Sequence, residues 1–180
     1  IIEKDVGVFL GWVAFMSGTR QLNGLEKFLD VVDLVQPINF SLMVTLRGEL
    51  TLELLSMASR LACERLPASL LVPHNRGTNQ SFFRPSPFGP RIEVASSERL
   101  DRTLARSINH RFDLNREGPI RIRWQPASNH HVLVVTFLHT SADATSGLQW
   151  LNTLIECLDL LVRGKKITPK KQSVPSQLLE

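Results

Sequence analysis

The sequence predicts an α/β fold in which a mixed β-sheet is flanked by helices. Segments with apolar residues at every second position, or in continuous runs, alternate along the chain with segments that have helical spacing. The 180 residues are 43% hydrophobic and 21% charged, which is typical of one globular domain. Internal repeats of about 20 to 50 residues are absent, and this excludes solenoids and propellers.

The first half of the sheet is predicted from three segments. Residues 24–35 carry apolar side chains on one helical face, and Pro37 ends this helix. Residues 38–47 alternate apolar and polar side chains, which indicates a half-buried strand. A second helix follows, with Thr51 as its cap and Pro67 as its end.

The middle of the chain is predicted to contain little regular structure. Residues 73–90 are rich in proline, glycine and asparagine, so we expect them to be mostly irregular and exposed, apart from a strand at residues 80–84. A strand at residues 91–95 and a helix at residues 98–109 follow.

The last predicted elements enclose a polar loop. Residues 120–124 alternate cleanly, whereas residues 131–138 are apolar almost throughout, so the second strand is expected at the centre of the sheet. A long helix is predicted at residues 147–162. Between this strand and helix lies LHTSADATSG, residues 138–147, and such strand-to-helix junctions are where α/β proteins place reactive side chains.

His139 is the candidate catalytic residue, because no other side chain in this loop exchanges a proton near neutral pH. The alternative is a hydrogen-bonded loop histidine in a scaffold without catalysis. Asp143 has the position of a helix N-cap. The remaining histidines are interpreted as structural or surface residues: His74, His110, His130 and His131.

The loop resembles the H-H-x-x-x-D-G signature of the superfamily of chloramphenicol acetyltransferases and nonribosomal-peptide condensation domains. His139 matches the second His and Asp143 the Asp, whereas Leu138 and Ala144 replace the first His and the Gly. Other segments resemble the same family in the same order: Phe112–Leu114 and Gly118–Arg121 are similar to F-D-L and G-P-L-R, and residues 21–28 and 40–61 are similar to its opening units. The resemblance covers residues 20–164 and implies a chloramphenicol acetyltransferase-like half-domain.

The resemblance implies acyl transfer from a thioester to an alcohol or an amine, with His139 as the general base. The donor would be acyl-CoA or the pantetheine arm of a carrier protein, and no cofactor would be bound permanently. Asp143 would support the catalytic loop through an arginine, for which Arg20, Arg47 and Arg65 are the candidates. The family's other half would complete the site, so the expected partners are a missing half, a carrier protein or further copies of the chain. The alternative is a non-catalytic binding or scaffold module.

The chain is expected to divide into three parts. Residues 1–19 are predicted to be an N-terminal extension, whose apolar run is too short to span a bilayer. Residues 20–164 form the condensation-like subdomain, and residues 165–180 form a basic tail or linker.

Charge distribution and cysteine content argue against two other classes of function, nucleic-acid binding and metal binding. The net charge is +4, but lysine and arginine are spread along the chain, which argues against a nucleic-acid partner. Cys63 and Cys157 lie in apolar helical patterns away from any second ligand, so no metal is expected. Reduced core thiols indicate a cytoplasmic location.

Overall fold

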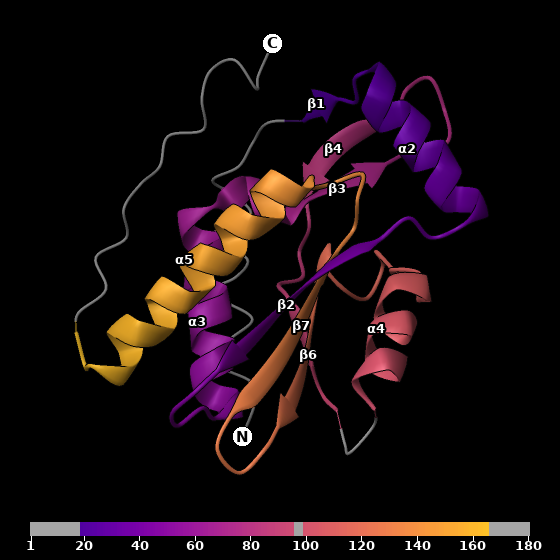
Figure 1. The fold of residues 1–180 in the computed structure, drawn as a ribbon. Coiled ribbons are helices and arrows are strands. Elements are labelled where there is room, and N and C mark those ends of the chain that lie inside the picture. The colour runs from indigo at the N-terminus through magenta and orange to yellow at the C-terminus, as the bar shows by residue number, and fades with distance from the viewer. Residues whose placement is uncertain (1–18, 96–98, 166–180) are drawn as a thin grey trace.

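A computed structural model describes residues 19–95 and 99–165. This part of the chain forms two β-sheets and several helices (Figure 1). The elements in chain order are β1 (Arg20–Gln21), α2 (Gly24–Val35), β2 (Phe40–Leu46), α3 (Leu52–Arg65), the 3₁₀-helix η1 (Pro67–Leu70), β3 (Leu71–His74), β4 (Phe82–Pro85), β5 (Arg91–Val94), α4 (Leu100–Asn109), β6 (Ile120–Pro126), β7 (His131–Phe137) and α5 (Ala144–Val162). The predicted α/β class is confirmed. The extension and the tail lie, apart from Thr19 and Lys165, outside the described residues.

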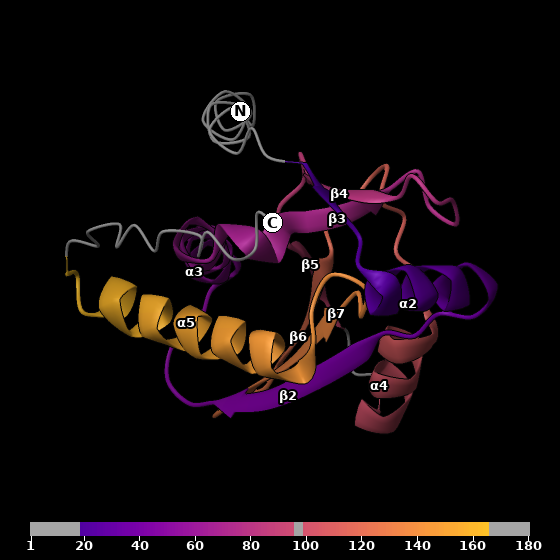
Figure 2. The same ribbon diagram turned by 90° about the horizontal axis from the view of Figure 1, so that it is seen from above.

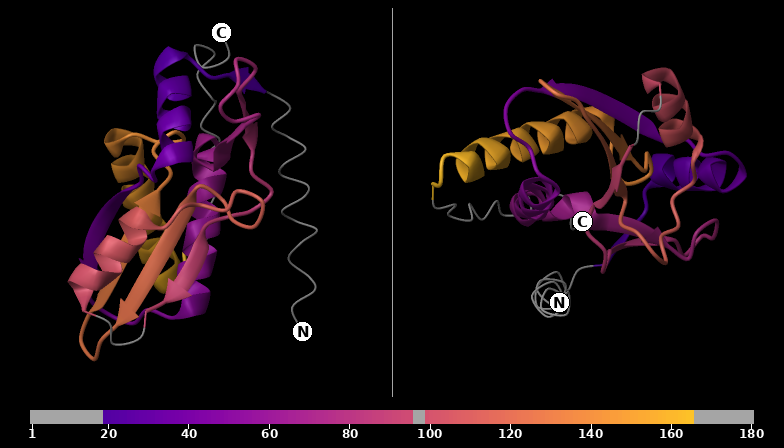
Figure 3. Two further views of the ribbon diagram at one scale, coloured as in Figure 1. Left: turned by 90° about the vertical axis from the view of Figure 1, so that its right-hand side faces the viewer. Right: turned by 90° about the horizontal axis from the view of Figure 1, so that it is seen from below.

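The larger sheet has the strand order β2-β7-β6-β5. Strands β5 and β6 are parallel and the other pairs are antiparallel, so the sheet is mixed as predicted. Strand β7 is an inner strand, and its residues 133–137 are all buried, which confirms the interpretation of its apolar run. Figures 2 and 3 show α3 and α5 together on one side of this sheet and α4 on the other.

The two faces of the larger sheet differ in chemistry. On β6, Ile120, Ile122 and Trp124 point into the apolar core with α3 and α5. Arg121 and Arg123 alternate with them and are therefore directed to the face that α4 covers. One face is thus a hydrophobic core, and the other carries buried charge.

The smaller sheet contains one strand that was not predicted. Residues 73–90 are mostly irregular as expected, and the strand expected at residues 80–84 is found as β4, but Leu71–His74 also forms β3 and pairs antiparallel with β4, while β1 pairs with the other edge of β4. Pro73 lies within β3. Because β3 is an edge strand, the missing N–H of a proline is tolerated there. Strand β3 was not predicted, because proline was interpreted only as a residue that interrupts regular structure.

Helix α2 has the predicted bounds, but most of its apolar face is exposed. Leu25 and Phe28 are 68% and 63% exposed. Asp30 and Asp33 are buried on the opposite side, where Arg76 from the β3–β4 loop forms an ion pair with each carboxylate. Burial alone lowers the pKa of Arg76, but the hydrogen bonds that Arg76 donates to Asp33 and Asp30, together with the charges of these carboxylates, outweigh burial and raise that pKa. The face of α2 that is turned inward is therefore the one whose carboxylates form buried ion pairs with Arg76.

Among the described residues, no helix combines the length and the apolar character that crossing a membrane requires.

Candidate active site

The loop that follows β7 is fixed by backbone hydrogen bonds. The N–H of Leu138 donates to the carbonyl of Pro119 at 3.0 Å, and the N–H groups of Ser141 and Ala142 donate to the carbonyl of Leu138 at 2.9 and 3.2 Å. Leu138 itself is fully buried. The residue after it, His139, is therefore held where β7 ends, beside the start of β6.

His139 is partly buried, and its ring has one defined polar contact. The Nδ1 atom lies 3.1 Å from the carbonyl oxygen of Ala142. A carbonyl oxygen only accepts hydrogen bonds, so Nδ1 carries the proton in this contact. In the neutral imidazole the lone pair is then on Nε2, which is the form that can accept a proton from a substrate.

Aromatic rings fix the other side of the imidazole. The ring of Phe40 meets His139 edge-on, with centroids 5.3 Å apart, and stacks on Phe137 at 5.2 Å. A Cβ atom on Gly147 would lie 2.8 Å from the Phe40 ring. Glycine at this position of α5 therefore provides the space that Phe40 occupies. Sequence analysis placed Phe40 on an apolar strand face but did not connect it with His139.

Asp143 is the N-cap of α5. Its Oδ1 accepts a 2.7 Å hydrogen bond from the N–H of Ser146, and the helix begins at Ala144, three residues before its predicted start. The hydrogen bonds from Ser146 are the main reason why the pKa of the Asp143 carboxyl is lowered, with a smaller contribution from the charge of His139. The N-cap interpretation of Asp143 is confirmed.

The expected arginine contact to Asp143 is not seen within residues 19–95 and 99–165. Arg20 pairs with Glu26 at 2.7 Å, and Arg65 pairs with Glu156 at 3.6 Å. The third candidate, Arg47, makes no ion pair with Asp143 in the same part of the chain. The described contacts hold this carboxylate through the helix cap.

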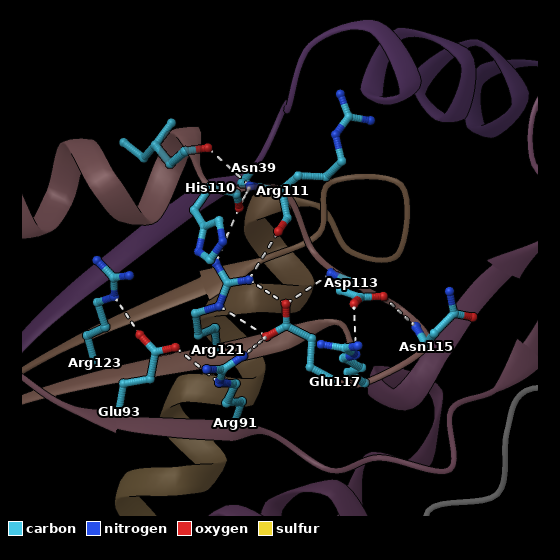
Figure 4. A network of polar contacts seen from close by, with 12 residues as sticks. Asn39, Arg91, Glu93, His110, Arg111, Asp113, Asn115, Glu117, Arg121 and Arg123 are labelled. Carbon is cyan, nitrogen blue, oxygen red and sulfur yellow. Dashed lines mark hydrogen bonds and ion pairs between the residues drawn. The ribbon is translucent and has the colours of Figure 1, made fainter.

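A buried ion pair, which sequence analysis missed, anchors the strand beside the loop (Figure 4). Arg121 donates to Glu117 through Nη2 at 2.6 Å and through Nε at 3.2 Å, and both side chains are almost fully buried. Glu117 also accepts from the N–H of Asp113 at 3.0 Å, and the guanidinium lies 4.3 Å from the ring centre of Phe112. The two segments that resemble F-D-L and G-P-L-R are therefore tied to each other by this pair.

Gly118 completes the connection to the loop. A Cβ atom at this position would lie 2.5 Å from the carbonyl oxygen of Phe88, so the backbone requires glycine here. The next residue, Pro119, is the one whose carbonyl receives the N–H of Leu138. The position of His139 thus depends on packing around Glu117 and Arg121.

The other histidines and the cysteines have ordinary structural environments. His131 accepts from the indole N–H of Trp124 at 3.3 Å, and its Nε2 contacts the carbonyl of Gly48. Both cysteines are free and buried, and burial raises the pKa of Cys63 to about 12. Within the described part of the chain, no group of three or more potential ligands is placed to hold a metal ion.

The sequence matches no protein-family model and no curated protein. Solved structures, in contrast, match well. The starter condensation domain of rhizomide synthetase superposes with a TM-score of 0.72 at 11% identity, covering 91% of this chain and 42% of that one. The chain folds as half of a condensation domain. The first condensation domain of the calcium-dependent antibiotic synthetase, in complex with a substrate analogue, gives a TM-score of 0.74 at 14% identity, over 91% of this chain and 44% of that one.

The X-domain from teicoplanin biosynthesis has the same fold, with a TM-score of 0.69, 22% identity, and coverage of 84% of this chain and 34% of that one. It also has a solved complex with OxyB. This chain therefore spans less than half the length of each of these condensation-type structures. The predicted chloramphenicol acetyltransferase-like half-domain agrees with them.

Proposed function

We propose that the chain is the first half of an acyltransferase of the condensation type, with His139 as its general base. The observation that carries the proposal is the contact between Nδ1 of His139 and the carbonyl of Ala142, because it leaves Nε2 unprotonated. The condensation-domain fold supports an acyl-transfer or condensation-related role for the chain.

The proposed reaction transfers an acyl group from a thioester to an alcohol or amine. Nε2 of His139 takes the proton from the acceptor as its oxygen or nitrogen attacks the thioester carbonyl. The tetrahedral intermediate then breaks its C–S bond, and the departing thiolate receives the proton from the imidazolium. General-base catalysis of this kind contributes roughly 10²- to 10⁴-fold to the rate. The donor would be acyl-CoA or a pantetheinyl carrier protein, and no cofactor would be retained.

The site would be completed by further polypeptide. Stabilising the oxyanion of the intermediate requires preorganised hydrogen-bond donors, and these usually contribute more than the base. The hydroxyl oxygens of Thr140 and Ser141 are buried beside His139 without a hydrogen-bond partner among the described residues. Such groups are normally satisfied in a finished site. The missing contacts would come from a second half, or from another copy of the chain.

Acyl transfer can be tested with the chain and any sequence that its gene encodes beyond it. Release of free CoA from acetyl-CoA and longer acyl-CoA thioesters is measured with amine and alcohol acceptors. We expect His139→Ala to lower the rate about 10²- to 10⁴-fold. His130→Ala, which removes a half-buried imidazole outside this loop, is the control and should leave the rate unchanged. Equal turnover by the His139→Ala variant would remove this residue from the mechanism.

The second candidate function is a non-catalytic binding module on the same scaffold. It is favoured by the exposed apolar face of α2 and by the teicoplanin X-domain, which has been solved in complex with OxyB. This alternative predicts that acyl transfer is absent under all conditions, and that substitutions on α2 impair binding of a protein partner. The acyl-CoA assay therefore separates the two candidates.

A further inference from the structure

A cavity of about 530 Å³ lies under the last turn of α4, on the charged face of the larger sheet. Its lining consists of Arg106, Asn109 and His110 from the end of α4 and Arg123 from β6. We call this cavity the α4–β6 pocket. Small-molecule sites commonly have volumes of roughly 300 to 1,000 Å³. The pocket is thus large enough for a small ligand, and its lining combines apolar surface with positively charged side chains.

Arg123 has an unsatisfied hydrogen-bond donor in this pocket. The residue is only 7% exposed, and its Nε donates to Glu93 at 3.0 Å. Its Nη1, however, is buried and has no hydrogen-bond partner within residues 19–95 and 99–165. A buried guanidinium N–H without a partner costs free energy unless a ligand accepts a hydrogen bond from it.

The surrounding charges leave a surplus of cations. Among the described residues, Arg91 pairs with both Glu93 and Glu117, Arg121 pairs with Glu117, and Arg123 pairs with Glu93. Three guanidinium groups therefore share two carboxylates (Figure 4). Arg106 also lines the pocket.

The end of a helix would ordinarily oppose an anion, because its last carbonyls carry partial negative charge. Here side chains donate hydrogen bonds to carbonyls at and just after the end of α4. Asn39 donates to the carbonyls of Ile108 and His110 at 3.1 and 3.0 Å. Arg121 donates to the carbonyls of His110 and Arg111 at 3.3 and 3.4 Å. These side-chain donors thus offset part of the negative charge at the end of α4, beside the pocket.

We propose that the α4–β6 pocket binds the phosphate group of a small phosphorylated ligand. Arg123 provides the buried donor and Arg106 a second guanidinium. His110 and Asn109, whose Nδ2 also donates to the carbonyl of Ala105 at 2.8 Å, provide further polar side chains. These donors come from two elements rather than from one planar fork, which suits a tetrahedral anion better than a carboxylate. A phosphate monoester also carries about −1.5 to −2 charge at pH 7, which balances the surplus of cations.

The test is calorimetric titration of the chain with inorganic phosphate, glycerol 3-phosphate and acetate at constant ionic strength. We expect saturable binding of both phosphates, weaker binding of acetate, and a shift of the Arg123 side-chain N–H resonance in NMR spectra. Arg106→Gln should weaken phosphate binding about tenfold, because it removes a charge-assisted hydrogen bond. Asn109→Ala should weaken it by a smaller factor. Both side chains are exposed, so these variants should fold even if Arg123→Gln does not.

Arg102→Gln is the matched control, because it removes the same charge from an exposed position of the same helix outside the pocket lining. Its affinity for phosphate should stay within about twofold of the unmodified chain. The proposal is overturned if phosphate does not bind saturably, if acetate binds equally well, or if glycerol 3-phosphate is excluded. Equal losses in Arg102→Gln and Arg106→Gln would also overturn it, since they would indicate general attraction by charge.

Discussion

Replacing Arg121 by methionine removes the guanidinium that compensates the charge of Glu117 in the interior. The side chains of Arg121 and Glu117 are 1% and 2% exposed, so water does not replace the lost contacts. Of its described partners, Glu117 would keep the N–H of Asp113 and the more distant Arg91, at 3.8 Å. Removing one partner of a buried pair typically costs about 3 to 5 kcal/mol. We therefore expect the Arg121→Met chain to lose about that much free energy of unfolding.

The assay is urea unfolding followed by circular dichroism at pH 7. Arg163→Met serves as the control, because its ion pair with Asp159 is exposed and should contribute at most about 1 kcal/mol. The double variant Arg121→Met with Glu117→Leu should recover part of the loss, since it leaves no uncompensated charge. A loss below about 1 kcal/mol for Arg121→Met alone would refute the proposed role of this pair.

Three further predictions concern the rest of the fold. Because burial raises the pKa of Cys63 and Cys157, a thiol reagent at pH 7 should label both only after unfolding; rapid labelling of the native chain would contradict their burial. Asp143→Ala should lower the free energy of unfolding by about 1 kcal/mol at pH 7, and Asp143→Asn should lower it by less. Since folding lowers the pKa of Asp143, the stabilisation by this carboxylate is present above the unfolded pKa and is lost as the pH falls through the folded pKa. A destabilisation by Asp143→Ala that does not depend on pH would count against the cap. If copies associate through α2, Phe28→Glu should shift the chain toward monomer in light scattering, whereas a monomeric unmodified chain would exclude such self-association.

Sequence patterns predicted correctly those elements whose structure depends on interactions between neighbouring residues. The helix at residues 24–35 follows from its periodicity, and its Asn23–Glu26 capping box lies at the start of the same helix. Its buried face could not be predicted, because that face depends on Arg76, more than 40 residues later in the chain. The edge strand β3 was missed for a related reason, since pairing with β4 outweighs the local signal of Pro73.

The candidate site was predicted in part. The junction of β7 and α5 identified His139 and Asp143, and the helix cap at Asp143 needed only its position before an apolar helix. The contact with Phe40 brings together residues far apart in sequence, and no spacing rule indicates it. The buried Glu117–Arg121 pair was missed because alternation alone does not distinguish a solvent-facing arginine from one under a helix.

The central claim is that His139 presents a basic Nε2 beside a strand end, and the ring nitrogens report on it directly. In ¹⁵N NMR spectra recorded at a pH where the imidazole is neutral, we expect Nδ1 to be protonated and Nε2 to have the shift of an unprotonated nitrogen. The opposite tautomer, with the proton on Nε2, would contradict the claim, because that nitrogen would then have no lone pair with which to accept a proton.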